Sequence, residues 1–136
     1  MATAEKYERY SATLRIYGKI EDMSVIGMRL GLEPTRVRRR GEPIEGTSER
    51  YQHDFWEMTA PVVRDRPLED HLAWLKSRLL PRGSVLRDIR TALSVDLFCE
   101  YRSNHAQGGF DLPPEALEWL VELGIGLEVA VVFESA

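Results

Sequence analysis

The chain has 136 residues and a mass of 15.6 kDa, which is the size of one compact domain. Its 43% hydrophobic and 29% charged residues are typical of a globular protein and exclude disordered, collagen-like and fibrous classes. A formal net charge of -4 argues against nucleic-acid binding, and no apolar run approaches the ~20 residues that span a bilayer, so we predict a cytoplasmic protein without nucleic-acid or membrane partners.

The first predicted element is a β-strand over residues 10–17. Leu14 and Ile16 would face the core of the protein. Arg15 and Tyr17 would then face away from it, because successive side chains of a strand point to opposite sides. This alternation is typical of a half-buried strand.

A short helix is predicted next. Asp22 is a typical residue to precede the first turn, and Ile26 and Leu30 supply a buried side. Gly31, followed by Pro34, ends the helix.

Residues 35–50 form the longest predicted loop, and we expect it to be mobile. It has several glycine and proline breaks and many charges. Its main feature is a cluster of arginines, namely Arg36, Arg38, Arg39 and Arg40. Guanidinium groups fit phosphate or carboxylate, so the cluster is a candidate anion site; the alternative is a solvated loop neutralised by neighbouring glutamates.

Residues 51–59 are rich in strand-forming residues, and we predict a second strand here. Its faces are ambiguous, because Phe55 and Trp56 are neighbours and cannot lie on the same side.

Three helical segments are expected in the second half of the chain. The first begins after Pro67 and has a core-facing stripe at helical spacing: Leu68, Leu72, Leu75 and Leu79. A second, shorter helix would be capped by Ser84 and bury Leu86 and Ile89. The third, over residues 113–123, is opened by proline and closed by Gly124.

Two further strands are predicted. In residues 93–101 the alternation is clean and turns Cys99 inward, where a thiol is a small, inert hydrophobe. Residues 125–133 are apolar on both sides, since Ala130 and Val132 join the second side. This strand is therefore predicted to be internal or covered twice. Sheet extension into a dimer and covering helices explain its pattern equally well.

This element order predicts an α+β fold. We expect a ferredoxin-like sandwich of two βαβ halves, with a four-stranded, largely antiparallel sheet and an inserted helical pair. Residues 1–8 would be an N-terminal tail, and residues 9–136 a single domain.

The sequence resembles a known family at four places: YSATLRIYG at 10–18, LGLEP at 30–34, an aromatic strand around Trp56, and LPPEALEWLVELG at 112–124. It is similar there to the bacterial domain of unknown function 4279. The likeness covers residues ~9–134, and its motifs are structural. It implies a small α/β protein for which no catalytic residues can be transferred.

No catalytic or metal-binding constellation stands out in the sequence. His53 and Glu57 would share one face of a strand but lie about 13 Å apart, too far to bind one ion. His71 falls on the flank of a helix and His105 in a loop. Phosphate-binding loops and serine nucleophile motifs do not occur. We therefore expect no metal and no cofactor, and we lean against an enzyme.

The sheet face turned away from the crossover helices is the strongest candidate site. If the first and third predicted strands are neighbours, opposite charges pair across them. Aromatic and arginine side chains supply most interface energy. The candidate residues on the strands are Arg15, Tyr17, Trp56, Asp96, Phe98 and Glu100. In the alternative interpretation the inserted helices cover this face through Trp74 or Leu86.

Two functions remain open at this point. The preferred one is a non-catalytic protein-interaction domain, binding another protein or itself, with an immunity-type antidote as one form. Its support is charge: residues 41–136 carry nine basic and 17 acidic side chains, a balance of -8 that suits a basic partner. The alternative is a small-anion binder or minor enzyme lined by Arg38, Arg40, His53 and Glu57.

Overall fold

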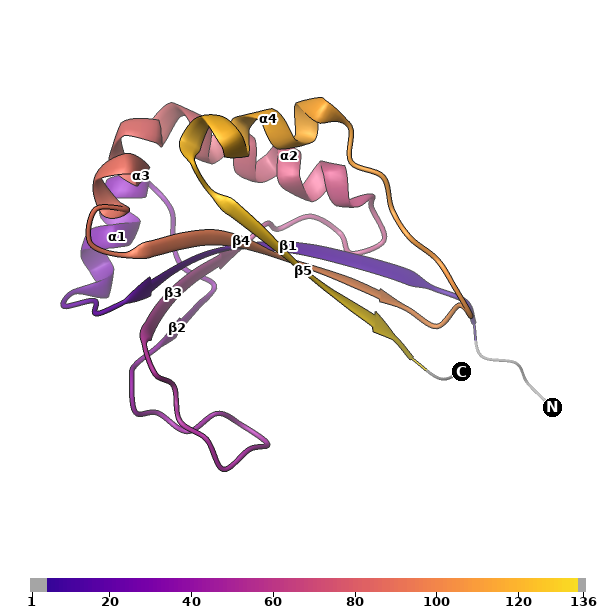
Figure 1. Ribbon diagram of the computed structural model, residues 1–136, viewed down its shortest axis with the longest axis horizontal. Coiled ribbons are helices and arrows are strands. Elements are labelled where there is room, and N and C mark those ends of the chain that lie inside the picture. Colours follow the sequence, from indigo (N-terminus) through magenta and orange to yellow (C-terminus); the bar gives the residue numbers. More distant parts are fainter. Residues whose placement is uncertain (1–4, 135–136) are drawn as a thin grey trace.

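The computed structural model describes residues 5–134, which form one five-stranded sheet with a helical layer on one side (Figure 1). The strands are β1 (Glu8–Gly18), β2 (Arg36–Arg38), β3 (Asp54–Thr59), β4 (Ser94–Ser103) and β5 (Gly126–Phe133). The helices are α1 (Met23–Leu30), α2 (Leu68–Leu79), α3 (Gly83–Ile89) and α4 (Pro114–Leu123), with a 3₁₀ turn at Leu80–Arg82. Among residues 5–134, none of the helices combines the length and the hydrophobicity that a membrane span requires.

The strand order is β2-β3-β1-β4-β5. The central strand, β1, pairs antiparallel with β3 on one side and with β4 on the other. The expected neighbourhood of the first and third predicted strands is therefore confirmed. β4 and β5 run parallel, and the chain between them passes through α4. Two parallel neighbours cannot be joined by a tight turn, because the chain must first return to the end of the sheet where the first strand began.

The α+β class is confirmed, but the sheet differs from the prediction. It has five strands rather than four and is mixed rather than largely antiparallel. The additional strand, β2, lies inside the predicted 35–50 loop. The ferredoxin-like order is not found, because β3 pairs directly with β1, whereas a βαβ half would place another strand between them.

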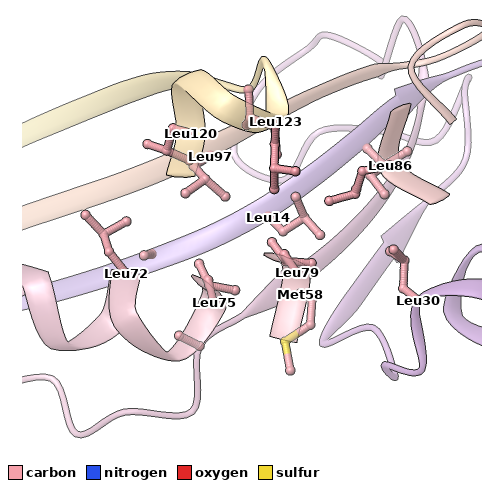
Figure 2. Packing of buried hydrophobic residues seen from close by; sticks show 14 of the residues in the cluster. Leu14, Leu30, Met58, Leu72, Leu75, Leu79, Leu86, Leu97, Leu120 and Leu123 are labelled. Carbon is pink, nitrogen blue, oxygen red and sulfur yellow. The ribbon is translucent and has the colours of Figure 1, made fainter. Parts of the chain in front are cut away.

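The helices cover a single face of the sheet (Figure 1). Between the two layers the leucine stripe of α2 meets Leu14 of β1 and Leu97 of β4, all essentially inaccessible to solvent (Figure 2). Leu120 and Leu123 of α4 reach the same core. The leucines predicted to lie on one side of this helix are therefore the residues that form the core.

The helix ends follow their local signals, with one exception. The Asp22 carboxylate accepts the backbone N–H of Ser24 at 3.0 Å and caps α1. Gly31 and Gly124 adopt φ values of 69° and 68° after α1 and α4, in the left-handed region that favours glycine. The prediction that Ser84 caps α3 is wrong, because the helix begins at Gly83.

The boundaries of the predicted domain lie close to the ends of the sheet. β1 begins at Glu8, within the predicted tail. Residues 1–4 of that tail and residues 135–136 of the predicted domain lie outside the described residues.

β5 contradicts its predicted environment. It is neither internal nor covered twice, but forms one edge of the sheet. Leu127, Val131 and Phe133 are 36%, 52% and 48% exposed. An apolar pattern shows which residues are hydrophobic, but it does not show whether another strand or helix of the same chain lies beside them.

Candidate functional site

The side of the sheet opposite the helices, which we call the open face, carries the candidate site. Its side chains come from alternate positions of four neighbouring strands: Arg15 and Tyr17 of β1, Phe55 and Glu57 of β3, Asp96, Phe98 and Glu100 of β4, and Glu128 of β5. The alternative in which Trp74 or Leu86 covers this face is wrong. Leu86 is fully buried on the helical side, and Trp74 packs partly buried against the same core.

Arg15 is the centre of the open face. Its Nε and Nη2 donate to the two carboxylate oxygens of Asp96 at 2.8 and 2.7 Å, and Nη2 also donates to Oε2 of Glu128 at 2.6 Å. The register places Arg15 directly opposite Asp96 on β4, and Glu128 lies one strand further. The hydrogen bonds that Arg15 donates to Asp96 raise the pKa of Arg15. This confirms the predicted pairing of charges across strands.

Aromatic rings surround the guanidinium group. Its central carbon lies 4.8 Å from the ring centre of Phe98 and 5.8 Å from that of Tyr17, within cation–π range. Tyr17 in turn stacks on Phe55 with ring centres 5.1 Å apart. His53 lies 5.9 Å from the Tyr17 ring. The result is a continuous strip of π surface with a fixed cation in it.

Trp56 does not belong to this surface. It is fully buried on the helical side of β3, and the neighbouring Phe55 occupies the open face instead. The sequence left this choice ambiguous. The alternation of side chains along a strand was a usable signal. Asp54, Trp56 and Met58 lie on one face of β3 and are buried, so Phe55 and Glu57 must lie on the other face.

Glu100 takes part in a second ionic group at the far end of the open face. Arg102 Nε donates to Glu100 at 3.0 Å, and its Nη1 lies 3.5 Å from the carboxylate of Glu134. The Tyr7 hydroxyl donates to Glu134 at 2.6 Å and lowers the pKa of that carboxyl. Sequence reasoning missed Arg102, Glu134 and Tyr7. Tyr7 and Glu134 lie 127 residues apart in the chain, so no local pattern connects them.

The arginines of the predicted cluster have different local partners. Arg36 and Arg38 lie on β2, and the Arg36 guanidinium donates to the Tyr51 hydroxyl at 2.6 Å. Arg39 donates instead to the carbonyl of Ile20 at 2.6 Å. Two arginines of the predicted anion site therefore lie on strand β2, and a third is bonded to the backbone of Ile20.

Asp54 holds that loop against the body of the protein. Its carboxylate accepts the backbone N–H of Ile20 at 2.9 Å and that of Arg40 at 2.8 Å. These two hydrogen bonds, led by the one from Arg40, lower the pKa of Asp54. Asp54 lies on the opposite side of β3 from Phe55 and Glu57. Loop mobility stays a prediction.

The remaining reactive side chains include a cysteine and a histidine that are both buried. Cys99 is fully buried, and burial raises the pKa of its thiol to about 12. His71 is 1% exposed, and its Nε2 lies 3.1 Å from the carbonyl of Arg66; burial lowers its pKa. Within residues 5–134, no group of three or more His, Cys, Asp or Glu side chains is arranged to hold a metal ion.

The geometry of the open face suits recognition. Its cation is already satisfied by two carboxylates, and the aromatic rings beside it are half-buried. A cavity of about 710 Å³ lies elsewhere, lined by α1 residues and by Leu32 and Pro34. Half-buried aromatic and arginine groups on a sheet face that no described helix covers offer contact area to a macromolecule.

One comparison with known proteins gives a match. The family model described as Domain of unknown function (DUF4279) matches residues 8–134, which is nearly the whole chain. No curated protein and no solved structure gives a significant match. The matched range runs from the first residue of β1 to just beyond β5 and so includes every strand and helix described above. The chain therefore belongs to the DUF4279 family.

Proposed function

We propose that this protein is a non-catalytic interaction domain that binds a protein partner on its open face. The observation that carries the proposal is the strip formed by Tyr17, Phe55 and Phe98 around Arg15, on a sheet face that no helix within residues 5–134 covers. Aromatic and arginine side chains are the commonest energetic centres of protein interfaces.

The central guanidinium supports this function because it is already ordered. Asp96 holds it in a bidentate pair, and the side chains of Arg15 and Asp96 are 20% and 19% exposed. A partner that packs on it need not immobilise a free arginine, which lowers the entropic cost of binding.

The charges of the open face are balanced. The cations on this face are Arg9, Arg15, Arg36, Arg38 and Arg102. The anions are equal in number: Glu57, Asp96, Glu100, Glu128 and Glu134. The acidic excess of the chain therefore lies outside this face. It would guide the approach of a basic partner, as an immunity-type antidote requires, while the open face makes the specific contact.

Photo-crosslinking in the native cell tests the proposal. Benzoylphenylalanine replaces Phe98 in one variant and, as the matched control, Met28 in another; Met28 is a 76% exposed apolar residue on α1. We expect a discrete crosslinked partner from position 98 and not from position 28. The purified partner should then bind wild type and lose at least about tenfold in affinity for Phe98→Ala.

Two results would contradict the proposal. One is the absence of any discrete crosslink at position 98. The other is a partner whose affinity for Phe98→Ala equals that for wild type although the variant is folded. A crosslinked product of exactly two copies of this chain would point to self-association instead.

Anion binding by the arginine cluster is the weaker alternative, because Arg36 and Arg39 already bond to Tyr51 and Ile20. A rise in melting temperature with phosphate, lost when Arg38 and Arg40 are both changed to alanine, would restore it.

A further inference from the structure

The outer edge of β5 has the composition of a strand that is paired on both sides. Three large hydrophobic side chains, Leu127, Val131 and Phe133, are exposed on its helical side. On its other side, Ala130 and Val132 are half-buried. Within residues 5–134, however, β5 has a strand neighbour on one side only, which is β4.

β5 also lacks the features that usually keep an exposed edge from pairing. Such edges are short, or carry lysine, proline or a bulge. β5 has eight residues without lysine or proline, and its register with β4 is unbroken. Its one charged residue, Glu128, is bonded to Arg15 on the open face. The opposite edge, β2, has three residues, two of them arginine.

The direction of the unpaired backbone groups follows from one hydrogen bond. The N–H of Glu134 donates to the carbonyl of Ser103 on β4 at 2.7 Å. Backbone groups of alternate residues in a strand point to opposite edges. The even-numbered residues of β5 therefore face β4. The N–H and C=O groups that face outward are those of Leu127, Val129, Val131 and Phe133.

These four residues define one antiparallel register between two copies of the strand. If Ala130 lies on the two-fold axis, Leu127 faces Phe133 of the second copy and Val129 faces its Val131. All four outward residues then exchange backbone hydrogen bonds, and the apolar side chains meet on the helical side. Glu128 faces a valine, and the two Glu128 residues are about 13 Å apart along the strands. A register centred on Glu128 would oppose like charges.

We propose that β5 pairs antiparallel with β5 of a second copy, in the register centred on Ala130, to form a continuous ten-stranded sheet. The surface used is the strand edge, so this inference is independent of partner binding on the open face. One strand pair gives a small interface, below about 1,200 Å² in total, which is typical of weak and reversible association. We therefore expect a dimer that dissociates in the micromolar range.

Cysteine substitution tests the register. In Ala130→Cys the two thiols would face each other in a pair whose Cα atoms lie about 4.5–5.5 Å apart, within the range of a disulfide. Val132→Cys is the matched control: it lies on the same side of the same strand and is similarly exposed, but it would face Glu128 of the second copy. Under mild oxidation we expect a disulfide-linked dimer from Ala130→Cys and none from Val132→Cys. The native Cys99 is fully buried and does not compete.

Sedimentation velocity over about 1–500 µM tests the association itself. Wild type should shift from monomer to dimer with concentration. Val131→Lys places a charge in the pairing row and should weaken association at least about tenfold. Val121→Lys makes the same change on α4 at an 82% exposed valine and should associate like wild type. Circular dichroism and melting temperature confirm that each variant is folded.

The proposal is overturned if wild type stays monomeric over the whole range. It is equally overturned if a dimer forms but Ala130→Cys crosslinks no faster than Val132→Cys, or if folded Val131→Lys dimerises with the same affinity as wild type. The proposal also fails if the protein stays monomeric and binds an extended peptide along β5, because the pairing strand would then come from a different protein.

Discussion

The two faces of the sheet are built from the same strands and differ in what they contact. Leu14 and Arg15 are adjacent in β1. Leu14 is fully buried beneath the helices, whereas Arg15 lies on the open face, tied to Asp96 and Glu128. The helical face is held by apolar burial, which depends on close packing. The open face is held by directional hydrogen bonds and ring contacts. The two faces should therefore respond differently to substitution.

The largest expected effect is on the helical face. Leu14→Ala leaves a cavity among the leucines of the core and should lower the free energy of unfolding by about 2–5 kcal/mol. Thr13→Ala, one position away on the open face, removes a hydroxyl pair with Thr59 at 2.8 Å and should cost about 1 kcal/mol. Urea unfolding of both variants measures the difference. Equal losses would show that the two faces are not held by different forces.

A smaller effect is expected at Asp54, with a defined pH dependence. Asp54→Asn weakens the acceptance of the N–H groups of Ile20 and Arg40 and should cost about 1–3 kcal/mol near neutral pH. The folded state lowers the pKa of Asp54 below the unfolded value of about 3.9. The stabilisation is therefore present above about pH 4 and is lost as the pH falls through the lower folded pKa.

Unfolding of wild type and Asp54→Asn, followed from neutral pH to about pH 2.5, tests this dependence. The difference in the free energy of unfolding between wild type and Asp54→Asn should become smaller as the pH falls. A difference that stays constant with pH would show that the charge of the Asp54 carboxylate does not stabilise the folded state.

The smallest effect is expected for Glu128→Gln on the open face. The Glu128 side chain is 61% exposed, and Arg15 keeps its bidentate pair with Asp96 when Glu128 is neutralised. We expect a loss of about 0–1 kcal/mol, measured in the same urea experiment. A loss as large as that of Leu14→Ala would show that the open face contributes to stability as strongly as the core does.

The local signals in the sequence were sufficient for much of the fold. The period-2 alternation in β1 and β4 assigned Leu14, Arg15 and Asp96 to their correct faces. The i, i+4 spacing of leucines predicted the buried side of α2, and Gly31 marked the end of α1. Each of these signals depends on residues within a few positions of one another, so composition and spacing are enough to read it.

The order of the strands, and with it the exposure of β5, was decided only by the tertiary structure. The alternation of β5 is the same whether a strand, a helix or solvent lies beside it. Likewise, nothing local indicates that Arg36 would join a sheet edge while Arg39 bonds to Ile20. These outcomes depend on pairings between residues far apart in the chain. Several segments can pair with the same strand, and the residue pattern within one segment does not show which of them will do so.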